Sequence, residues 1–353
     1  MKDFLKNKQK WIVVLVILGL MFVAGGFGVA SYLYGNRCYR GYEVKNKVNR
    51  SDSNNVNYRY HNGNILKYSN DGAFYLDAAN ELIWNQTYEM SSPKLDTCGN
   101  YLSIYDKGGT KIYILTPTKL VGSIETTMQI QQVCVAEQGT VAVLMKKDKA
   151  AYLALYDREG NSLAEGEIHG QNGGYPIAIA LSNDAVKLAV SMININEGSV
   201  KSTIAFYNYG TVGQNEIDHC VGVNNYDDMV IPEMEFTSND RMVAFGDTKA
   251  VIFEGAQKPQ AIAEIPMDEK TKSIFYNEHY IGIVTGNEDE AVTNHLAVYD
   301  ENGILCAINR VPLETTGNTS VSVDKNDNAE KAKIFVFSST LQPIITSEEF
   351  PLI

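Results

Sequence analysis

The feature that most constrains the fold is a turn signature that recurs along the chain at nearly constant spacing. The signature is a strand that ends in an apolar residue, Tyr and then Asp or Asn, followed by a turn with Gly or Asn. It occurs at residues 105–108, 156–160, 207–210 and 299–303. A weaker copy lies at residues 253–255 and an early one at 76–80. From Asp106 onward the steps between copies are 51, 51, 46 and 46 residues. A period of this length is typical of a repeat architecture in which each unit is one supersecondary element.

A second pattern alternates with the first and consists of an apolar strand, a polar turn and another apolar strand. Its turns are Gln138-Gly139, Asn183-Asp184, Asn239-Asp240 and Asn277-Glu278. The apolar runs are short and rich in β-branched and aromatic residues, as in strands, and no window shows sustained helical periodicity. A unit of this length with two hairpins is a propeller blade.

We therefore expect an all-β fold, a β-propeller of about six to seven four-stranded blades. A twisted open array or a pair of packed sheets is the alternative. The step from Asp77 to Asp106 is only 29 residues, which makes the first unit irregular. Beyond Asp300 only residues 333–337 fit the pattern well, so the sequence leaves the closure of the ring open.

Residues 11–34 form a run of 24 residues without a charge. A helix of that length would span about 36 Å, more than the roughly 30 Å hydrocarbon core of a bilayer. Trp11 at one end and Tyr32 and Tyr34 at the other suit the two membrane interfaces. We expect one N-terminal transmembrane helix that acts as a signal anchor. The alternative is a signal peptide cleaved after Ala30, which follows small residues.

These observations divide the chain into four parts. Residues 1–10 are a short basic tail, 11–34 the transmembrane helix, 35–60 a polar linker and 61–353 the propeller ectodomain. Basic residues flank the apolar run on both sides, but a basic tail before an apolar run is typical of an export signal. We therefore expect the N-terminus inside the cell and the large domain outside the cytoplasmic membrane, at the cell envelope.

Charge and cysteine usage limit the classes of partner. Residues 1–50 hold nine basic and two acidic residues, and the rest of the chain has a net charge of −19. So acidic a domain would repel phosphate backbones, which argues against nucleic acid as a partner. The five scattered cysteines, Cys38, Cys98, Cys134, Cys220 and Cys306, fit neither a disulfide framework nor a zinc site. We expect the last four of these cysteines to be small buried side chains within strands.

One early segment resembles a repeat of quinoprotein-type propellers. Residues 70–84 contain Asp71-Gly72, a strand ending in Asp77-Ala78, a turn and then Trp84, with Asn80-Glu81 where those repeats usually have Thr-Gly. We expect Trp84 in the core. The whole chain is similar to a family of uncharacterised single-pass membrane proteins from Firmicutes with a propeller-like ectodomain. That likeness rests on the tail and anchor, the Trp84 unit, Gly174-Tyr175-Pro176 and Phe206-Tyr207-Asn208, and it implies no activity.

Motifs for chemistry are missing from the sequence. It has no HExxH pattern, no Gly-x-Ser-x-Gly elbow and no phosphate-binding Gly-rich loop. Residues 324–328 alternate carboxylates and amides, but Ala329 and Phe335 stand where a calcium loop needs Gly and Glu. We expect no metal and no cofactor. A hydrolase or a quinone-dependent dehydrogenase is the least favoured alternative.

The segment 169–176 is the most unusual one, because three glycines surround the polar and aromatic side chains of His169 and Tyr175. These two residues are the candidate ligand- or partner-binding residues, against the simpler interpretation of a long turn with Tyr175 packed down. The function that follows is a non-catalytic binding or scaffold module at the cell envelope, with a protein or envelope partner. The alternative is a ligand sensor that works through a membrane partner.

Overall fold

The structure is a computed structural model that describes residues 56–148, 150–168, 174–196, 199–267, 271–286, 293–312, 320–323, 334–337 and 343–346, together with Gly19, Gly25 and Gly26. The described chain forms six four-stranded antiparallel sheets and one three-stranded sheet, and strands adjacent in sequence pair with each other within each sheet. We name the sheets blades A to G in chain order. The all-β propeller expected from the sequence is confirmed, with six four-stranded blades.

Blades A, B and C are consecutive meanders of short strands. Their strands are β1 (Asn57–His61), β2 (Asn64–Ser69), β3 (Gly72–Leu76), β4 (Leu82–Thr87), β5 (Pro93–Cys98), β6 (Tyr101–Asp106), β7 (Lys111–Leu115), β8 (Leu120–Glu125), β9 (Gln129–Val135), β10 (Val141–Lys147), β11 (Ala150–Tyr156) and β12 (Ser162–Ile168). The first strand begins at Asn57, inside the segment that we expected to be linker.

Blades D, E and F continue the same order. Their strands are β13 (Tyr175–Leu181), β14 (Lys187–Asn196), β15 (Ser199–Asn208), β16 (Cys220–Asp227), β17 (Glu233–Phe236), β18 (Arg241–Phe245), β19 (Lys249–Glu254), β20 (Gln260–Pro266), β21 (Thr271–Tyr276), β22 (Tyr280–Gly286), β23 (Thr293–Asp300) and β24 (Leu305–Pro312). Blade D has the longest hairpin, and two short 3-10 helices, η1 (Gly213–Asn215) and η2 (Ile217–His219), lie between β15 and β16.

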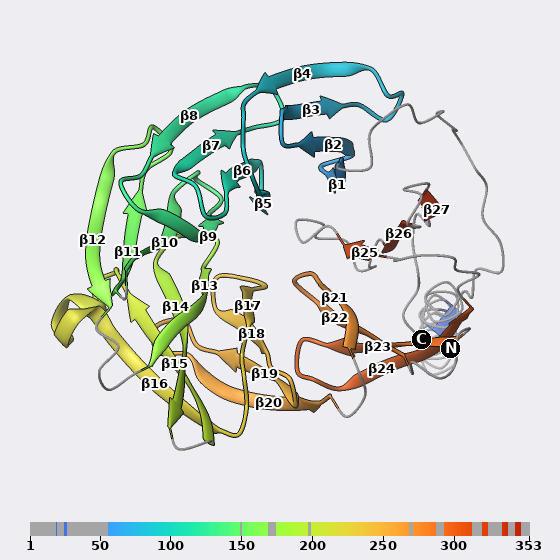
Figure 1. Cartoon of the computed structure of the whole chain (residues 1–353). Helices are drawn as coiled ribbons and strands as arrows, with labels where there is room; N and C mark the ends of the chain where they lie inside the picture. Colours follow the sequence, from blue (N-terminus) through green and yellow to red (C-terminus); the bar gives the residue numbers. More distant parts are fainter. Residues whose placement is uncertain are drawn as a thin grey trace, which may run out of the picture.

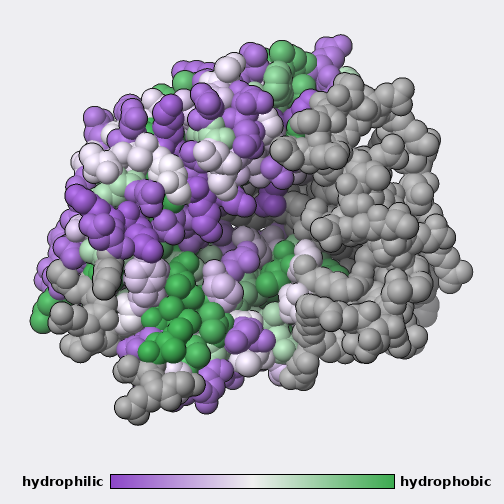
Figure 2. Space-filling view, in the orientation of Figure 1, coloured by the Kyte–Doolittle hydropathy of each residue, from purple (hydrophilic) through white to green (hydrophobic). Residues whose placement is uncertain are grey.

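The three-stranded blade G comes last and comprises β25 (Ser320–Val323), β26 (Ile334–Phe337) and β27 (Pro343–Thr346). Its first strand contacts β21 of blade F and β1 of blade A. The sheets are therefore arranged around a common centre, with the first strand of each blade innermost and the last outermost (Figure 1). Figure 2 shows a largely hydrophilic surface over blades A to C, whereas hydrophobic residues gather over blade D.

The recurring Asp of the sequence signature caps the turn between the third and fourth strands of a blade. Oδ1 of Asp157 accepts hydrogen bonds from the backbone N–H groups of Glu159 and Asn161. Asp77 and Asp300 accept the equivalent pair of bonds in blades A and F. The carboxylate accepts hydrogen bonds from backbone N–H groups that have no backbone acceptor in a tight turn, which explains why Asp recurs at this position.

Blade B explains the irregular first spacing. Tyr105-Asp106 ends β6, the second strand of blade B, rather than its third strand. The third strand, β7, ends at Leu115, and its turn begins at Thr116, whose hydroxyl donates to the carbonyl oxygen of Lys119. The sequence signature was therefore assigned to the wrong strand in this blade, and the turn at residues 116–119 restores a regular step from Asp77 to Asp157.

The cap at Asp157 makes stability depend on pH in the acid range. The side chain of Asn161 and then its backbone N–H bond to this carboxylate and hold its pKa below the ordinary value of 3.8. A group whose pKa is lowered by folding stabilises the protein above its ordinary pKa, and this contribution is lost as the pH falls through the lowered pKa.

We therefore expect Asp157→Ala to lower the urea midpoint at pH 7 and to leave it nearly unchanged at pH 2. Urea unfolding at both pH values measures this difference. The exposed Glu89→Ala is the control and should show no such difference between the two pH values. An equal loss at both pH values would contradict the assigned role of the carboxylate.

Consecutive blades are held together by apolar side chains, because one sheet alone leaves its faces bare. The buried side chains form five clusters, at the A/B, B/C, C/D, D/E and E/F contacts. Cys98 and Cys134 are buried within them, as expected, and Cys220 is half-buried. Trp84 packs on Tyr75 with ring centroids 5.2 Å apart, and its indole N–H donates to the carbonyls of Thr116 and Pro117 in blade B. Trp84 is half-buried and packs against the A/B cluster from outside, so the expectation that it belongs to the core is confirmed only in part.

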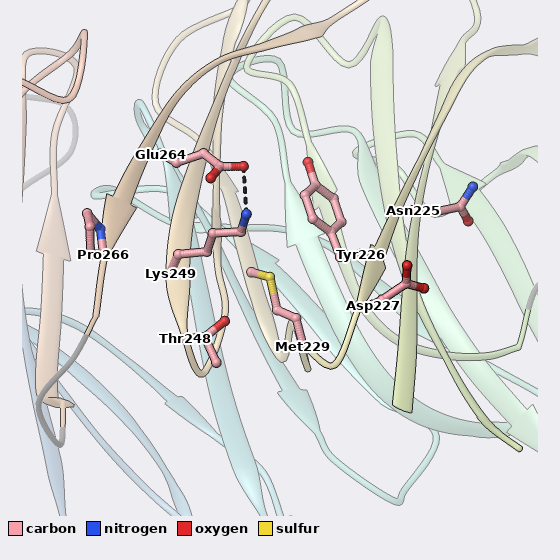
Figure 3. A pocket seen from close by; sticks show the side chains of 8 residues that line it. All are labelled: Asn225, Tyr226, Asp227, Met229, Thr248, Lys249, Glu264 and Pro266. Atoms are coloured by element: carbon pink, nitrogen blue, oxygen red, sulfur yellow. Dashed lines mark hydrogen bonds and ion pairs between the residues drawn. The ribbon is translucent and has the colours of Figure 1, made fainter. Parts of the chain in front are cut away.

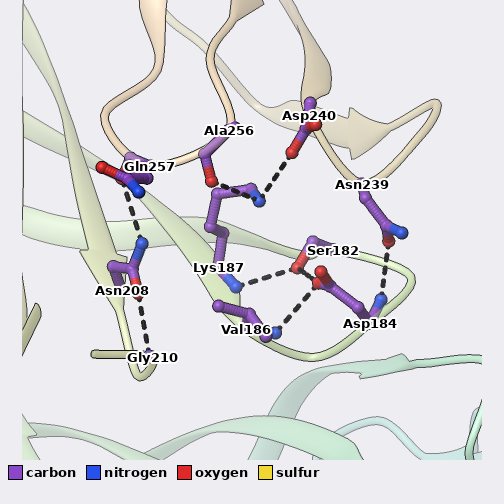
Figure 4. Close-up of polar contacts among 10 residues, drawn as sticks. All are labelled: Ser182, Asp184, Val186, Lys187, Asn208, Gly210, Asn239, Asp240, Ala256 and Gln257. Carbon is purple, nitrogen blue, oxygen red and sulfur yellow. Dashed lines mark hydrogen bonds and ion pairs between the residues drawn. The ribbon is translucent and has the colours of Figure 1, made fainter. Parts of the chain in front are cut away.

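A polar network also joins blades D and E (Figure 4). Lys187 is 2% exposed, and its Nζ donates to Oδ1 of Asp240 and to the carbonyl of Ala256, both at 3.0 Å. The side chain of Asn208 donates to the carbonyl of Gln257, and the N–H of Asp184 donates to Asn239. These bonds link the turns of the two blades at one end of their strands and fix how the sheets meet.

Within the part of the chain that the structure describes, no helix is long and apolar enough to cross a membrane. Apart from Gly19, Gly25 and Gly26, the predicted anchor at residues 11–34 lies outside that part. The loop 324–328 lies outside it as well.

Candidate functional site

The up-and-down order of the strands gives the ring two distinct faces. The turns between first and second strands and between third and fourth strands emerge on one face, which we call the turn face. The turns between second and third strands and the connections between blades emerge on the other. The polar network of Lys187 lies on the turn face.

The opposite face carries a groove between the outer parts of blades D and E, and we call it the groove face. The groove has a volume of about 590 Å³ and is lined by Asn225, Tyr226, Asp227, Met229, Thr248, Lys249, Glu264 and Pro266. The first three come from the end of β16 in blade D, and the last four from blade E, so two walls face each other (Figure 3). Its volume lies within the range of small-molecule sites.

The floor of the groove is built by a close approach of the two blades. Oγ of Ser202 in β15 donates to the carbonyl of Met229 at 2.6 Å, which holds the β16–β17 connection against blade D. The Met229 side chain is buried. A Cβ at Gly246 would collide with that side chain and would lie 2.8 Å from the carbonyl oxygen of Lys249. Glycine at 246 therefore allows the β18–β19 turn to lie directly on Met229.

The side chains of Lys249, Glu264 and Tyr226 form the polar centre of the groove. Nζ of Lys249 lies 2.7 Å from Oε1 of Glu264 and 5.7 Å from the centre of the Tyr226 ring. Burial, and secondarily the negative charge of Glu264, raises the pKa of the Tyr226 phenol to about 12. The phenol is therefore protonated at neutral pH and can donate a hydrogen bond.

Asn225 and Asp227 flank Tyr226 in β16, and alternation along the strand directs their side chains to the opposite face of blade D. Oδ1 of Asp227 lies 3.6 Å from Nζ of Lys201, and the Asp227 side chain is 83% exposed. Oδ1 of Asn225 accepts a hydrogen bond from Thr203 on that same face. The Tyr226 and Thr248 hydroxyls have no hydrogen-bond partner among the residues that the structure describes.

A second group of charges gathers where the first strands of the blades meet. Glu233 in β17 is exposed to solvent, yet the surrounding protein lowers its hydration and raises its pKa, and the positive charge of Arg59 in β1 opposes that rise. Burial also raises the pKa of Tyr276 in β21, and the charges of Glu235 and Glu233 act in the same direction. The charges of side chains from blades A, E and F therefore interact at the centre of the ring. Within the described ranges, no three His, Cys, Asp or Glu residues are grouped to hold a metal ion.

The structure describes only one of the two residues that the sequence suggested for ligand or partner binding. Tyr175 begins β13 on the groove face, is half-buried, and has the Lys146 ammonium 5.5 Å from its ring centre. It does not line the groove between blades D and E. His169 lies outside the described residues. That these two residues bind a ligand stays a prediction.

Sequence reasoning missed every lining residue of the groove. Tyr226, Lys249 and Glu264 belong to ordinary strands, and no motif or spacing links them. They meet because the ends of β16, β19 and β20 come together across two blades. The only local signal was the run of polar residues at Asn224-Asn225-Tyr226-Asp227, which is unusual for the end of a strand.

Comparison with solved structures supports the fold. Hydrazine synthase of Kuenenia stuttgartiensis matches with a TM-score of 0.56 and 11% identity, over 88% of this chain and all of that one. The complex of KlAtg21 with the coiled-coil of AgAtg16 gives 0.50 and 15%, over 70% and 82% of the two chains. A structure of the mitotic checkpoint complex gives 0.51 and 9%, over 86% and 96%.

At such low identity the likeness concerns the fold alone. No curated protein matches the sequence. The sequence model of the family of unknown function DUF5711 matches residues 35–320, which include all the strands of blades A to F. The chain therefore belongs to the family DUF5711.

Proposed function

We propose that the chain is a membrane-anchored, extracytoplasmic β-propeller that acts as a non-catalytic binding or scaffold module, with the D/E groove as its binding surface. The observation that carries the proposal is the groove itself. It presents the hydroxyls of Tyr226 and Thr248 beside the carboxylate of Glu264, between two sheets that are fixed to each other. Rigid scaffolds with polar groups at their rim suit recognition, because little ordering is needed on binding.

The rigidity of the site follows from the contact between the two blades. The D/E cluster contains fourteen buried apolar residues, and the Lys187 network ties the opposite end of the same contact. The groove therefore rests on a packed core rather than on a loop. A binding surface of this kind keeps its geometry without a ligand.

The charged groups of the groove favour binding over catalysis. Lys249 and Glu264 are paired with each other. The pKa of Tyr226, at about 12, lies far from neutral pH, whereas a general acid or base works best with a pKa near the operating pH. These properties suit a group that donates hydrogen bonds to a ligand.

The membrane anchor in this proposal rests on the sequence. Residues 11–34 carry no charge over a length that matches a bilayer, and a basic tail precedes them. The acidic ectodomain, with its net charge of −19 beyond residue 50, would be repelled by anionic lipid headgroups. The anchor would therefore hold at the membrane a domain that has no electrostatic affinity for it.

The proposal is tested in intact cells with the full chain. Sodium carbonate extraction should leave the protein in the membrane fraction, and external protease should digest the large domain. A photo-crosslinking residue at the exposed Thr248 should give a reproducible adduct, whereas the same residue at Glu159, on the turn face of blade C, should give none. Release by carbonate would refute the anchor, and equal labelling at both positions would refute the groove.

A further inference from the structure

We propose that the end of the β14–β15 hairpin in blade D contacts the lipid surface of the membrane that holds the anchor. The inference rests on the proposed function, because the anchor is what keeps the propeller close to a bilayer. It follows from the length of the hairpin, from the apolar side chains at its end and from the face on which the chain enters the propeller.

The β14–β15 hairpin projects beyond the strands on either side of it. Its pairing with β13 ends at Ile193, and its pairing with β16 ends at Lys201. Two further pairs of the hairpin, at residues 195–196 and 199–200, have no neighbouring strand, and we call these four residues the hairpin tip. At about 3.4 Å per residue, the tip extends about 7 Å past its neighbours. The equivalent hairpin of blade E has no such extension, because β17 and β20 pair with it up to its turn.

The hairpin tip carries no charge and presents apolar side chains on one face. Ile195 and Val200 stand directly opposite each other in the register, so their side chains share that face. Ile195 is 67% exposed, and among the large hydrophobic residues that the structure describes only Ile217 is more exposed, at 86%. Apolar side chains of interfacial segments enter the boundary between headgroups and acyl chains by about 5–10 Å, a depth that the extension of the tip matches.

The hairpin tip lies on the face from which the chain leads back to the anchor. The β14–β15 turn joins a second strand to a third, so it emerges on the groove face. β1 is a first strand and ends at a turn on the opposite face, so it begins at Asn57 on the groove face as well. The 22 residues 35–56 separate β1 from the uncharged run at 11–34. A coil of that length has ends about 26 Å apart on average, so the anchor brings this face toward the bilayer.

The charge of the domain indicates an apolar contact rather than an electrostatic one. The chain beyond residue 50 has a net charge of −19, and the hairpin sequence includes Glu197. Anionic headgroups would therefore repel the domain. The transfer of apolar side chains out of water needs no opposite charge. We therefore expect the contact to be strongest with a zwitterionic lipid surface.

The test places a photo-crosslinking residue at Ile195 in the full chain, reconstituted in phosphatidylcholine vesicles. Irradiation should give a phospholipid adduct, which mass spectrometry identifies. The matched control has the same crosslinking residue at Ile217, which is more exposed but lies on the turn face, between β15 and β16. We expect about tenfold more lipid adduct at position 195 than at position 217. Phosphatidylglycerol added to the vesicles should lower the adduct at position 195.

A second pair of variants tests the apolar face with the crosslinking residue kept at position 195. Val200→Asp should lower the lipid adduct about fivefold, because a charge beside this position is costly in an apolar layer. Val200→Thr keeps the shape of the side chain without a charge, so it should lower the adduct less than about twofold. Melting temperatures of both variants are measured to show that the fold is intact.

Three results would overturn the proposal. They are equal lipid adducts at positions 195 and 217, absence at both included, a larger adduct on vesicles with phosphatidylglycerol, and a protein adduct in place of lipid at position 195 in intact cells. If the chain then stays in the membrane fraction after carbonate extraction, the anchor stands and only the lipid contact of the hairpin is wrong. Release by carbonate overturns the anchor of the proposed function as well.

Discussion

Replacing Phe206 by alanine is expected to lower the free energy of unfolding by about 4 kcal/mol, as is usual for a large aromatic side chain removed from a core. Phe206 lies in β15 and is fully buried in the D/E cluster. Its ring centre is 5.1 Å from that of Phe253 in blade E, at an angle of 59°. The substitution removes this contact and leaves a cavity between two sheets that cannot easily move together, because the polar network of Lys187 fixes their ends.

The measurement is thermal and urea unfolding of the full chain in detergent, with a fall in melting temperature of roughly 8 °C at about 2 °C per kcal/mol for a domain of this size. Phe74→Ala is the matched control, because Phe74 is 39% exposed in β3 and should cost less than about 1 kcal/mol. Similar losses in the two variants would mean that the D/E cluster is not a main source of stability.

The architecture was largely predictable because it depends on local patterns that repeat. The hairpins at Asn183-Asp184, Asn239-Asp240 and Asn277-Glu278 were placed correctly, since polar turn residues between two apolar runs leave few alternatives. The Asp caps were visible for a physical reason, because Asp supplies the two hydrogen bonds that these turns need. Repeating units give such signals several times, and each copy strengthens the others.

The error in blade B shows the limit of pattern matching. Tyr105-Asp106 has the residues of a third-strand end, yet Asp106 serves a different turn, where its Oδ1 accepts a hydrogen bond from the N–H of Ser92. The true third-strand turn uses Thr116 and Pro117, which the Tyr-Asp signature does not include. A side chain that can cap a turn does not reveal which turn it caps.

The groove was beyond sequence reasoning for a different reason. Its walls meet only after blades D and E have packed, and which side chains of β16 face blade E depends on the register with β15. A bulge between Phe206 and Tyr207 shifts that register, so alternation counted from the start of β16 gives no reliable side assignment. Sites assembled between blades therefore have to be read from the structure.

Replacing Lys187 by alanine is the second substitution for which we expect a large effect, about 3 kcal/mol. It removes a buried aliphatic stem and two hydrogen bonds, and it leaves the carbonyl of Ala256 without this donor. Asp240 is 54% exposed, so water can replace part of the lost ion pair and the cost stays below that of an isolated buried charge. Lys187→Met keeps the stem and loses only the polar contacts, so it should cost about half as much.

Urea unfolding of both variants, combined with Asp240→Asn in a double-mutant cycle, separates the ion pair from the packing, and we expect a coupling energy of about 1 kcal/mol between the two positions. Lys201→Ala provides the control, because its ion pair with Asp227 lies at the surface and should contribute less than about 0.5 kcal/mol. If Lys187→Ala cost no more than Lys201→Ala, the contact of blades D and E would depend on apolar packing alone. The network would then add specificity to how the blades meet, without adding stability.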